Sequence, residues 1–325
     1  MFTQENIQNK NVLLRADLDV TLKEGRVVDN YRLQALLPTI RFCLEHAQKI
    51  VIIGHLGRPQ GTDLALSLAP VRDSLKKLLN QDISLLYSGI SPGDRWEGES
   101  PLVLMENLRF DSREEKLDRG FASELAQGAD IYIYESFANY RNSTSLTLIP
   151  EVLPTFTGFR FDEEVKALQK VLHNPLHPTL LLASGAKRDK LEIINQITPK
   201  FDQVLRGGLF AKPEDLTPDG LDLNEETTSL FVRQISAAKT IVINGPLGRY
   251  EDGTHSMATK AIFQAILASG AFSVIGGGDT LTAIQALGFS NASFGFVSTG
   301  GGAMLEFLAT GAHPLLETLK NVKLS

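Results

Sequence analysis

Three glycine-rich turns, each following a short β-branched or apolar run, constrain the fold of this chain most. They are Asn244-Gly-Pro-Leu-Gly-Arg-Tyr-Glu251, Ile275-Gly-Gly-Gly-Asp279-Thr280 and Ser298-Thr-Gly-Gly-Gly-Ala303. Glycine lets backbone N–H groups close on an anion, and turns after successive parallel strands meet at one edge of the sheet. The pattern therefore predicts an edge that binds several phosphates, which is typical of a nucleotide enzyme.

Short apolar runs alternate with amphipathic helical patterns along the whole chain. This alternation is typical of βαβ units, whose right-handed crossovers place helices on both faces of a parallel sheet. The predicted fold class is α/β, with two doubly wound parallel-sheet domains. Helices are expected at 31–47, 69–79, 120–127, 190–197 and 254–268. Strands are expected at 12–15, 50–53, 102–105, 131–134, 179–183, 204–206, 240–243, 273–275 and 293–297.

The length of 325 residues exceeds the size at which one hydrophobic core stops growing, so two domains are expected. We predict an amino-terminal domain for an anionic substrate at 1–157 and a connecting helix at 158–174. A carboxy-terminal nucleotide-binding domain with a terminal tail is predicted at 175–325. The stretch 212–226, rich in Pro, Asp, Glu, Thr and Gly, is predicted to be a surface loop.

Composition narrows the class of protein. The chain is 43% hydrophobic and 22% charged, with a formal net charge of −6, which argues against nucleic acid or an anionic membrane as the main partner. Cys43 is the only cysteine, so no intrachain disulfide forms and a reducing cytoplasm is expected.

Residues 261–278 are uncharged, but polar residues and glycines interrupt them, so we expect a helix running into a buried strand rather than a membrane span. A monomer is expected.

Positively charged side chains follow several of the predicted strands in the amino-terminal half. Because an arginine fork binds carboxylate and phosphate oxygens in pairs, converging arginines suit a small ligand that carries both groups. The alternative is that each arginine makes a surface ion pair and that His55 is a structural histidine. The segments are Arg15-Ala-Asp17-Leu-Asp19, His55-Leu-Gly-Arg58-Pro59, Glu106-Asn-Leu-Arg109-Phe110 and Tyr140-Arg141-Asn-Ser-Thr-Ser145, and Arg32 opens the first helix.

Taken together, these segments resemble the phosphoglycerate kinase family, in order from about Val12 to Leu319. The family's His-Leu-Gly-Arg-Pro and Glu-Asn-Leu-Arg-Phe segments stand unchanged at 55–59 and 106–110, and the three glycine-rich turns look like family signatures. The resemblance implies a Mg²⁺-dependent kinase of glycolysis. Such an enzyme transfers a phosphoryl group between ATP and the carboxylate of 3-phosphoglycerate, or a related acid, through an acyl phosphate.

The resemblance also implies residue roles, which suit phosphoryl transfer because that reaction needs positioning and charge neutralisation. The acid substrate would contact Asp17, Asp19, Arg32, His55, Arg58, Arg109 and Arg141. Catalysis would use Arg32, Lys187, Gly300 and Gly301, with Lys187 meeting the moving phosphoryl group. ATP or ADP would contact Gly185, Ala186, Lys187, Lys190, Gly207, Gly208, Asn244, Pro246, Glu251, Gly277, Gly278, Asp279 and Thr280. Asp279 is the expected carboxylate for Mg²⁺, and a hinge would bring the two substrates together.

Three of the departures of this chain from the family pattern bear most on its function. Asp19 stands where the family has asparagine, and a carboxylate there would repel an anionic substrate. Lys187 and Lys190 are separated by three positions, where the family has four. Only residues 209–221 fill the interval between the Gly-Gly turn and the Asp-x-Gly-Pro-like segment, so the second domain is expected to be reduced.

Three functional readings follow. The retained Lys187, Asp279, Arg32 and 300–302 favour an active kinase. The shortened nucleotide domain and Asp19 favour a catalytically impaired paralogue that binds a nucleotide or anion, or acts as an interaction protein. Glycine-rich turns alone would also suit a dinucleotide oxidoreductase. That reading ranks far lower, because no Gly-x-Gly-x-x-Gly with a following acidic residue comes after the first strand.

Overall fold

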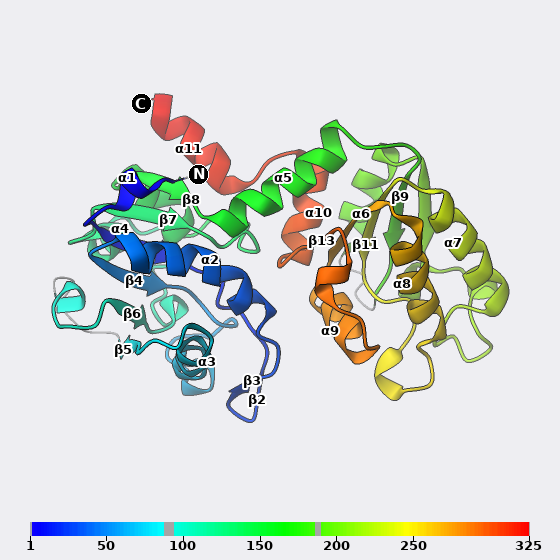
Figure 1. The fold of residues 1–325 in the computed structure, drawn as a ribbon, viewed down its shortest axis with the longest axis horizontal. Coiled ribbons are helices and arrows are strands. Elements are labelled where there is room, and N and C mark those ends of the chain that lie inside the picture. The colour runs from blue at the N-terminus through cyan, green and yellow to red at the C-terminus, as the bar shows by residue number, and fades with distance from the viewer. Residues whose placement is uncertain (1, 88–93, 186–189, 325) are drawn as a thin grey trace. The chain divides into compact units, whose positions relative to one another are not determined.

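The computed structural model describes residues 2–87, 94–185 and 190–324, which form two compact units (Figure 1). The first unit groups residues 1–163 with 313–325, and the second contains residues 164–312. The boundary therefore falls inside helix α5 (Phe159–His173). The last residues, 313–325, group with the first unit, whereas the sequence pattern assigns them to the second.

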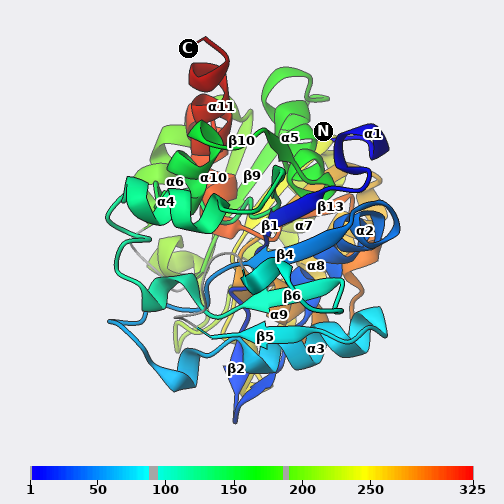
Figure 2. The same ribbon diagram turned by 90° about the vertical axis from the view of Figure 1, so that its left-hand side faces the viewer.

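The first unit is built on a six-stranded parallel sheet in the order β5-β6-β4-β1-β7-β8. Figure 2 shows β1, β4, β6 and β5 side by side. The strand order reverses at β1, as it does in doubly wound folds. The two strands of this sheet that the sequence did not predict, β5 and β8, are three-residue edge strands, too short to show a period. The strands are β1 (Asn11–Arg15), β4 (Lys49–Ile53), β5 (Ser84–Leu86), β6 (Leu102–Met105), β7 (Ile131–Tyr134) and β8 (Thr155–Thr157).

Central strands of this sheet are buried on both faces, which explains their nearly continuous apolar sequences. Every residue of β4 and β7 is buried. A short hairpin, β2 (Leu22–Lys23) and β3 (Arg26–Val27), lies outside the sheet. The helices of this unit, besides the start of α5, are α1 (Gln4–Ile7), α2 (Tyr31–His46), α3 (Ala69–Leu79), α4 (Arg119–Ala126) and α11 (Pro314–Leu324).

The second unit contains a five-stranded parallel sheet in the order β10-β9-β11-β12-β13. Helix α7 packs against α8, and α6 against α10. The strands are β9 (Thr179–Ala183), β10 (Gln203–Arg206), β11 (Thr240–Asn244), β12 (Phe272–Gly276) and β13 (Phe296–Val297). The helices are α6 (Leu191–Ile197), α7 (Glu225–Ala237), α8 (Met257–Ser269), α9 (Gly278–Ala286) and α10 (Gly301–Thr310). The predicted α/β class with two parallel sheets is confirmed.

Two local predictions in the second unit differ from the structure. Residues 291–293 form a short 3₁₀ turn, so the last strand begins only at Phe296. The stretch 212–226 is not wholly a surface loop, because Asp222 and Leu223 are buried and Leu216 pairs with Leu223. The uncharged stretch 261–278 does run from α8 into β12, and no helix among the described residues is long and apolar enough to cross a membrane.

His313 attaches the last segment of the chain to the first unit. Its ring lies 5.1 Å from that of Phe137 and 4.9 Å from that of Phe161, between ring centroids, and is almost completely buried. Nδ1 accepts a hydrogen bond from the Leu315 N–H (3.2 Å), so Nε2 carries the proton and donates to the Phe137 carbonyl oxygen (3.1 Å). Burial lowers the pKa of His313 to about 4.

Lowering the pH should therefore weaken the attachment of residues 313–325 to the first unit. The folded-state pKa of His313 lies below its unfolded value, so between the two values the unfolded chain binds the extra proton and stability falls as pH falls. The His313→Gln variant keeps an N–H donor but does not titrate. Between pH 7 and pH 5, the free energy of unfolding measured with urea should fall by about 2 kcal/mol more in wild type than in the variant. Equal losses in the two proteins would contradict this account.

Candidate active site

A cavity of about 330 Å³ lies at the carboxyl edge of the first sheet, and it gathers all seven residues predicted to contact the acid. Its wall comes from the segments that follow β1, β4, β6 and β7, together with the first turn of α2. Carboxyl ends of parallel strands share one sheet edge, which is why segments distant in sequence meet there. The lining residues are Asp17, Asp19, Arg32, His55, Arg58, Arg109, Glu115, Ala138, Asn139, Tyr140, Arg141, Asn142 and Ser143.

A buried hydrogen-bond network orients His55. The Arg15 side chain is fully buried; one terminal nitrogen lies 2.6 Å from His55 Nδ1, and Nε donates to Ser145 Oγ (3.0 Å). Ser145 Oγ in turn donates to a carboxylate oxygen of the buried Glu114 (2.6 Å). Because a guanidinium only donates, Nδ1 accepts and the proton of the neutral ring lies on Nε2.

His55 is a neutral donor on the cavity wall. Burial, followed by the charges of Arg15 and Arg109 and then those of Arg32 and Arg58, holds the pKa of His55 well below its usual value. A neutral imidazole with its proton on Nε2 donates one hydrogen bond without adding a further charge.

Asp17 contributes an acceptor to the same wall. One of its carboxylate oxygens accepts from Arg32 (3.2 Å), whereas Oδ2 is buried and has no hydrogen-bond partner among the described residues. Burial raises the pKa of Asp17, and the Arg32 charge opposes that effect. A buried acceptor without a partner is costly, so this oxygen suits a ligand that brings a hydroxyl donor.

Gly57 ties two more cavity residues in place. Its N–H donates to a carboxylate oxygen of Asp19 (2.8 Å), and its carbonyl oxygen accepts from Arg109 (2.7 Å). Arg109 Nε also pairs with the Glu115 carboxylate (3.3 Å). Arg58 and Arg141 are exposed, and within the described part of the chain neither makes a hydrogen bond or an ion pair. Both residues line the cavity.

Sequence reasoning missed the residues that support the cavity. Arg15 and Ser145 stand inside the quoted segments, but only the fold shows that they and Glu114 form a chain behind His55. The sequence does hold a signal for Arg15, because it is the last residue of an apolar strand. An arginine at such a position is buried only when it has partners. Nothing in the local sequence marks Glu115 as a partner of Arg109.

At the carboxyl edge of the second sheet, two side chains tie the glycine-rich turns together. Asn244, fully buried at the end of β11, accepts from Lys190 Nζ (2.9 Å) and donates to the Gly301 carbonyl oxygen (3.2 Å). Thr280 Oγ1 accepts from the Gly245 N–H (2.8 Å) and donates to the Gly276 carbonyl oxygen (3.0 Å). The turns that follow β11, β12 and β13 are thus held together at one edge.

Glycine is required where these turns pack backbone against backbone. A methyl group on Gly301 would lie 2.4 Å from Gly277 Cα, and one on Gly245 would lie 2.0 Å from the Ser184 carbonyl oxygen. Beside Gly208, which has a φ of +53°, it would lie 2.7 Å from the Gly185 carbonyl oxygen. A methyl group on Gly278 would have nothing within 4 Å. The first three glycines therefore serve packing as well as any anion binding.

The other predicted nucleotide residues have different surroundings. Asp279 is exposed in the first turn of α9, and Glu251 is exposed in a 3₁₀ turn, η10 (Tyr250–Asp252). The Pro246 carbonyl oxygen accepts from Ser184 Oγ (2.6 Å), and the Gly300 N–H donates to Ser298 Oγ (3.2 Å). Gly207 follows β10 directly. Ala186 and Lys187 lie outside the described residues.

A magnesium site, if present, would depend on few protein ligands. Among the described residues no group of three or more His, Cys, Asp or Glu side chains could hold a metal ion. Mg²⁺ commonly takes one or two carboxylates together with substrate phosphates and water, so the single exposed carboxylate of Asp279 fits such an ion.

These features define a two-domain α/β protein that carries an arginine-lined cavity on one sheet and glycine-rich turns on the other. The model of the phosphoglycerate kinase family matches residues 2–213 and 212–311. The phosphoglycerate kinase of Streptomyces avermitilis is 33% identical, with 98% of each chain covered, and that of Moorella thermoacetica is 32% identical, with 95% of each covered. The chain therefore belongs to the phosphoglycerate kinase family.

Solved structures of the family agree with the fold. Phosphoglycerate kinase from Pyrococcus horikoshii OT3 has a TM-score of 0.88 at 26% identity, covering 99% of each chain. The enzyme from Coxiella burnetii has a TM-score of 0.81 at 27% identity, covering 97% of each.

The comparisons also bear on the length of the second unit. The S. avermitilis alignment runs over 394 residues, and 98% of 325 residues is about 319, so about 75 aligned positions have no counterpart in this chain. The two matched segments of the family model meet at 212–213, inside the interval identified from the sequence as shortened.

The glycine contacts predict a matched pair of substitutions. Gly301→Ala should destabilise the protein by roughly 1–3 kcal/mol, because its methyl group meets the Gly277 backbone, which cannot swing aside. Gly278→Ala places the same methyl group in open space at the first residue of α9 and should leave stability unchanged or slightly higher. Thermal denaturation of both variants checks this, and identical midpoints would contradict it.

Proposed function

We propose that this protein transfers a phosphoryl group between ATP and the carboxylate of 3-phosphoglycerate, or a closely related phosphorylated acid, in the presence of Mg²⁺. The observation that carries the proposal is one cavity lined by four guanidinium groups, the neutral His55 and an Asp17 oxygen that has no partner within the described ranges. Such a set suits a ligand with a phosphate, a carboxylate and a hydroxyl group. Membership of the phosphoglycerate kinase family supports the same reaction.

Different cavity residues are proposed to contact different groups of the acid. Arg58 and Arg141, which line the cavity, are proposed to bind the phosphate of the acid. Asp17 Oδ2 would accept from its hydroxyl group and His55 Nε2 would donate to an oxygen. Arg32 is proposed to offset charge on the transferring phosphoryl group, which needs charge neutralisation more than covalent help.

The second unit is proposed to hold the nucleotide. Backbone N–H groups at the starts of α9 and α10 carry the partial positive charge that attracts phosphate, and Lys190 on Asn244 adds a full charge beside them. Asp279 would hold Mg²⁺, which would offset phosphate charge when bound. Lys187 is proposed to meet the transferring group.

The second candidate is a paralogue that binds an anion or nucleotide without turnover. The exposed Asp19 carboxylate on the cavity wall favours it, because it opposes an anionic ligand. A coupled assay with 3-phosphoglycerate, Mg²⁺ and ATP, beside a panel of other phosphorylated and plain carboxylic acids, separates the two. Turnover of one acid supports the kinase, and binding without turnover of any acid supports the paralogue.

Removing the Lys187 charge should affect the reaction and spare the fold. We expect Lys187→Ala to lower kcat roughly 10²–10³-fold, because a charge placed for the transition state is lost. Lys212→Ala, which removes a lysine with an exposed side chain in the same unit, is the control and should keep its rate. Steady-state kinetics on both variants tests this; an unaltered rate in Lys187→Ala would remove Lys187 from the mechanism.

Asp19 should limit affinity for the acid. An asparagine can still accept from the Gly57 N–H but carries no charge, so Asp19→Asn should bind 3-phosphoglycerate roughly tenfold more tightly. Asp73→Asn makes the same change of net charge on α3, outside the cavity wall, and should have no effect. Calorimetric titration gives the dissociation constants of both variants for 3-phosphoglycerate. Unchanged or weaker binding by Asp19→Asn would refute the argument that Asp19 repels the acid.

A further inference from the structure

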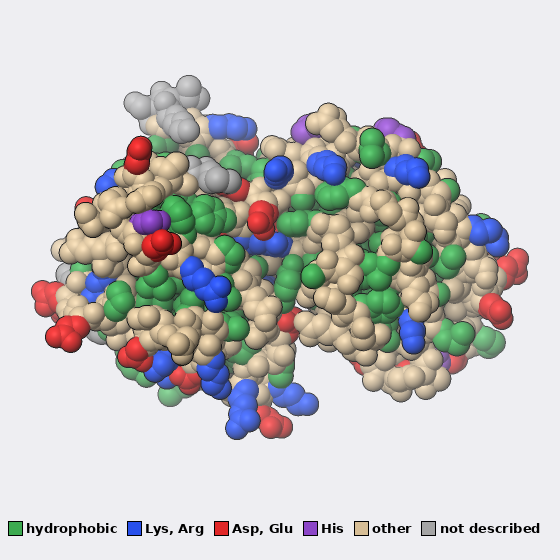
Figure 3. Space-filling model, viewed as in Figure 1, with side chains coloured by type: hydrophobic (Ala, Val, Ile, Leu, Met, Phe, Trp, Pro, Cys, Tyr) green, Lys and Arg blue, Asp and Glu red, His purple; other side chains and the backbone are tan. Residues whose placement is uncertain are grey.

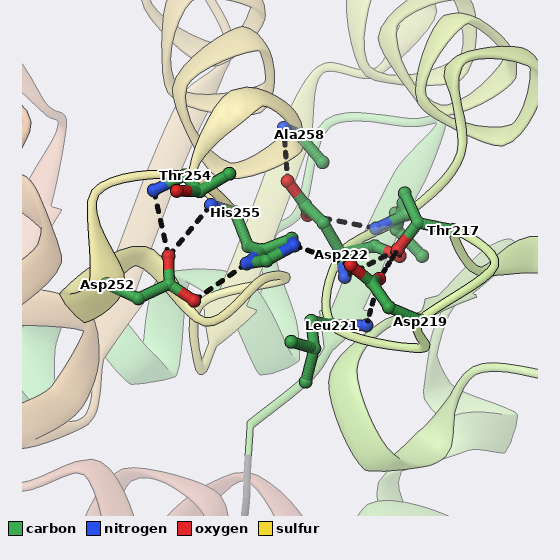
Figure 4. Close-up of polar contacts among 9 residues, drawn as sticks. Thr217, Asp219, Leu221, Asp222, Asp252, Thr254, His255 and Ala258 are labelled. Atoms are coloured by element: carbon green, nitrogen blue, oxygen red, sulfur yellow. Dashed lines mark hydrogen bonds and ion pairs between the residues drawn. The ribbon is translucent and has the colours of Figure 1, made fainter.

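The connection between β10 and α7 is fastened to the segment after β11 by three charged side chains, here called the His255 clamp: Asp219, Asp252 and His255 (Figure 4). Nδ1 of His255 lies 2.7 Å from a carboxylate oxygen of Asp252, and Nε2 lies 2.8 Å from one of Asp219. Because both neighbours are acceptors, both ring nitrogens carry protons and the ring is a cation.

Each aspartate of the clamp is already oriented by its own turn. Oδ1 of Asp219 accepts from Thr217 Oγ1 (2.7 Å) and from the Leu221 N–H (3.1 Å). Oδ1 of Asp252 accepts from the N–H groups of Thr254 (2.8 Å) and His255 (3.0 Å). The second oxygen of each carboxylate is thereby aimed at the imidazole, so the cation joins two preformed turns (Figure 4).

A second tie runs beside the clamp. Asp222 is buried; its two carboxylate oxygens accept from the Leu223 N–H (2.9 Å) and from the Ala258 N–H at the start of α8 (3.2 Å). The Arg249 N–H donates to the Leu221 carbonyl oxygen (2.9 Å). A methyl group on Gly248 would lie 2.3 Å from both Asp222 Oδ1 and the His255 carbonyl oxygen. Residues 217–223 and 248–258 are therefore one packed piece.

The segment 248–258 includes η10, which carries Glu251 and contacts the turn after β12. Tyr250, in the same turn, donates through its hydroxyl group to the Asp279 main-chain oxygen (3.4 Å). The other end of the clamp lies in the connection that is short in this chain, where the two matched segments of the family model meet. Asp219 thus follows, within the same connection, the point where the two matched segments meet.

We propose that His255 is a positioning residue for nucleotide binding: it pins the shortened connection to η10 and so fixes Glu251 and the Asp279 turn. The inference rests on the proposed function. His255 touches neither substrate in this account; it acts through Asp252 and Asp219. Loss of the His255 side chain should weaken Mg·ATP binding and leave binding of the acid substrate unchanged.

The clamp should depend on pH. The charged groups set against the ring are Asp252 on its own segment and Asp219 and Asp222 across from it. Hydrogen bonds that the ring donates to Asp252 and Asp219 raise the pKa of His255, and hydrogen bonding holds the pKa of each of those two carboxyls to about 2. A raised folded-state pKa means that the stability from the clamp is present below the unfolded-state pKa of the imidazole and is lost as pH rises through the folded-state value.

The test compares His255→Gln with wild type in the full-length protein. We expect the KM for Mg·ATP to rise roughly tenfold with kcat changed less than about threefold, and the KM for 3-phosphoglycerate to stay constant. In wild type the KM for Mg·ATP should rise with pH above the raised pKa of His255, whereas in the variant it should be flat. His255→Arg, a permanent cation, should recover part of the affinity without that pH dependence.

A matched control lies in the same unit. His177 pairs with Asp202 (2.6 Å) on an exposed surface outside the clamp, so His177→Gln should leave both KM values unchanged. Asp219→Asn, which alters a half-exposed carboxylate, replaces His255→Gln if that variant fails to fold.

Hydrogen exchange separates this inference from the proposed function. Amides at 217–223 should exchange faster in His255→Gln than in wild type, whether or not the protein is a kinase. If wild type neither binds nor turns over Mg·ATP, the proposed function and the role in nucleotide binding both fail, and exchange still reports on the clamp. If wild type is active and His255→Gln shows the wild-type KM and pH profile, the positioning role is overturned while the proposed function stands.

Discussion

The concentration of positive charge at one edge of the first sheet is the constraint on which the rest of the site depends. Four guanidinium groups from separate segments share one cavity of about 330 Å³, where like charges repel. Three carboxylates, those of Asp17, Asp19 and Glu115, offset part of that charge, and His55 stays neutral. Elsewhere the visible face of the molecule intersperses basic with acidic side chains (Figure 3). The donors left over in the cavity therefore call for an anionic ligand.

The carboxyl edge of the second sheet is built differently, from turns in which backbone packs against backbone. Its turns pack so closely that Gly245 and Gly301 admit no side chain, and Asn244 and Thr280 tie the turns together. This packing is local to the turns. Between β10 and α7, beside the buried Asp222 and Leu223, the ion pairs of His255 with Asp219 and Asp252 join the connection to the segment after β11. Those ion pairs depend on the protonation of a single imidazole.

The parts that could be predicted from the sequence were those with local signals. Central strands such as β4 and β11 are apolar runs buried on both faces, and the motif residues cluster because parallel strands end at one edge. The edge strands β5 and β8 are too short to show a period. The grouping of 313–325 with the first unit depends on His313 meeting Phe137 and Phe161, and the clamp joins Asp219 to His255. Such pairings between distant positions leave no local pattern.

The central claim is that the arginine-lined cavity binds the acid substrate, and calorimetric titration of 3-phosphoglycerate tests it most directly. Arg58→Gln and Arg141→Gln are the informative variants, because neither arginine makes a hydrogen bond or ion pair within the described residues, so the fold should be unaffected. The account predicts one binding site in wild type and binding at least roughly tenfold weaker in each variant. Wild-type affinity in both variants would contradict it.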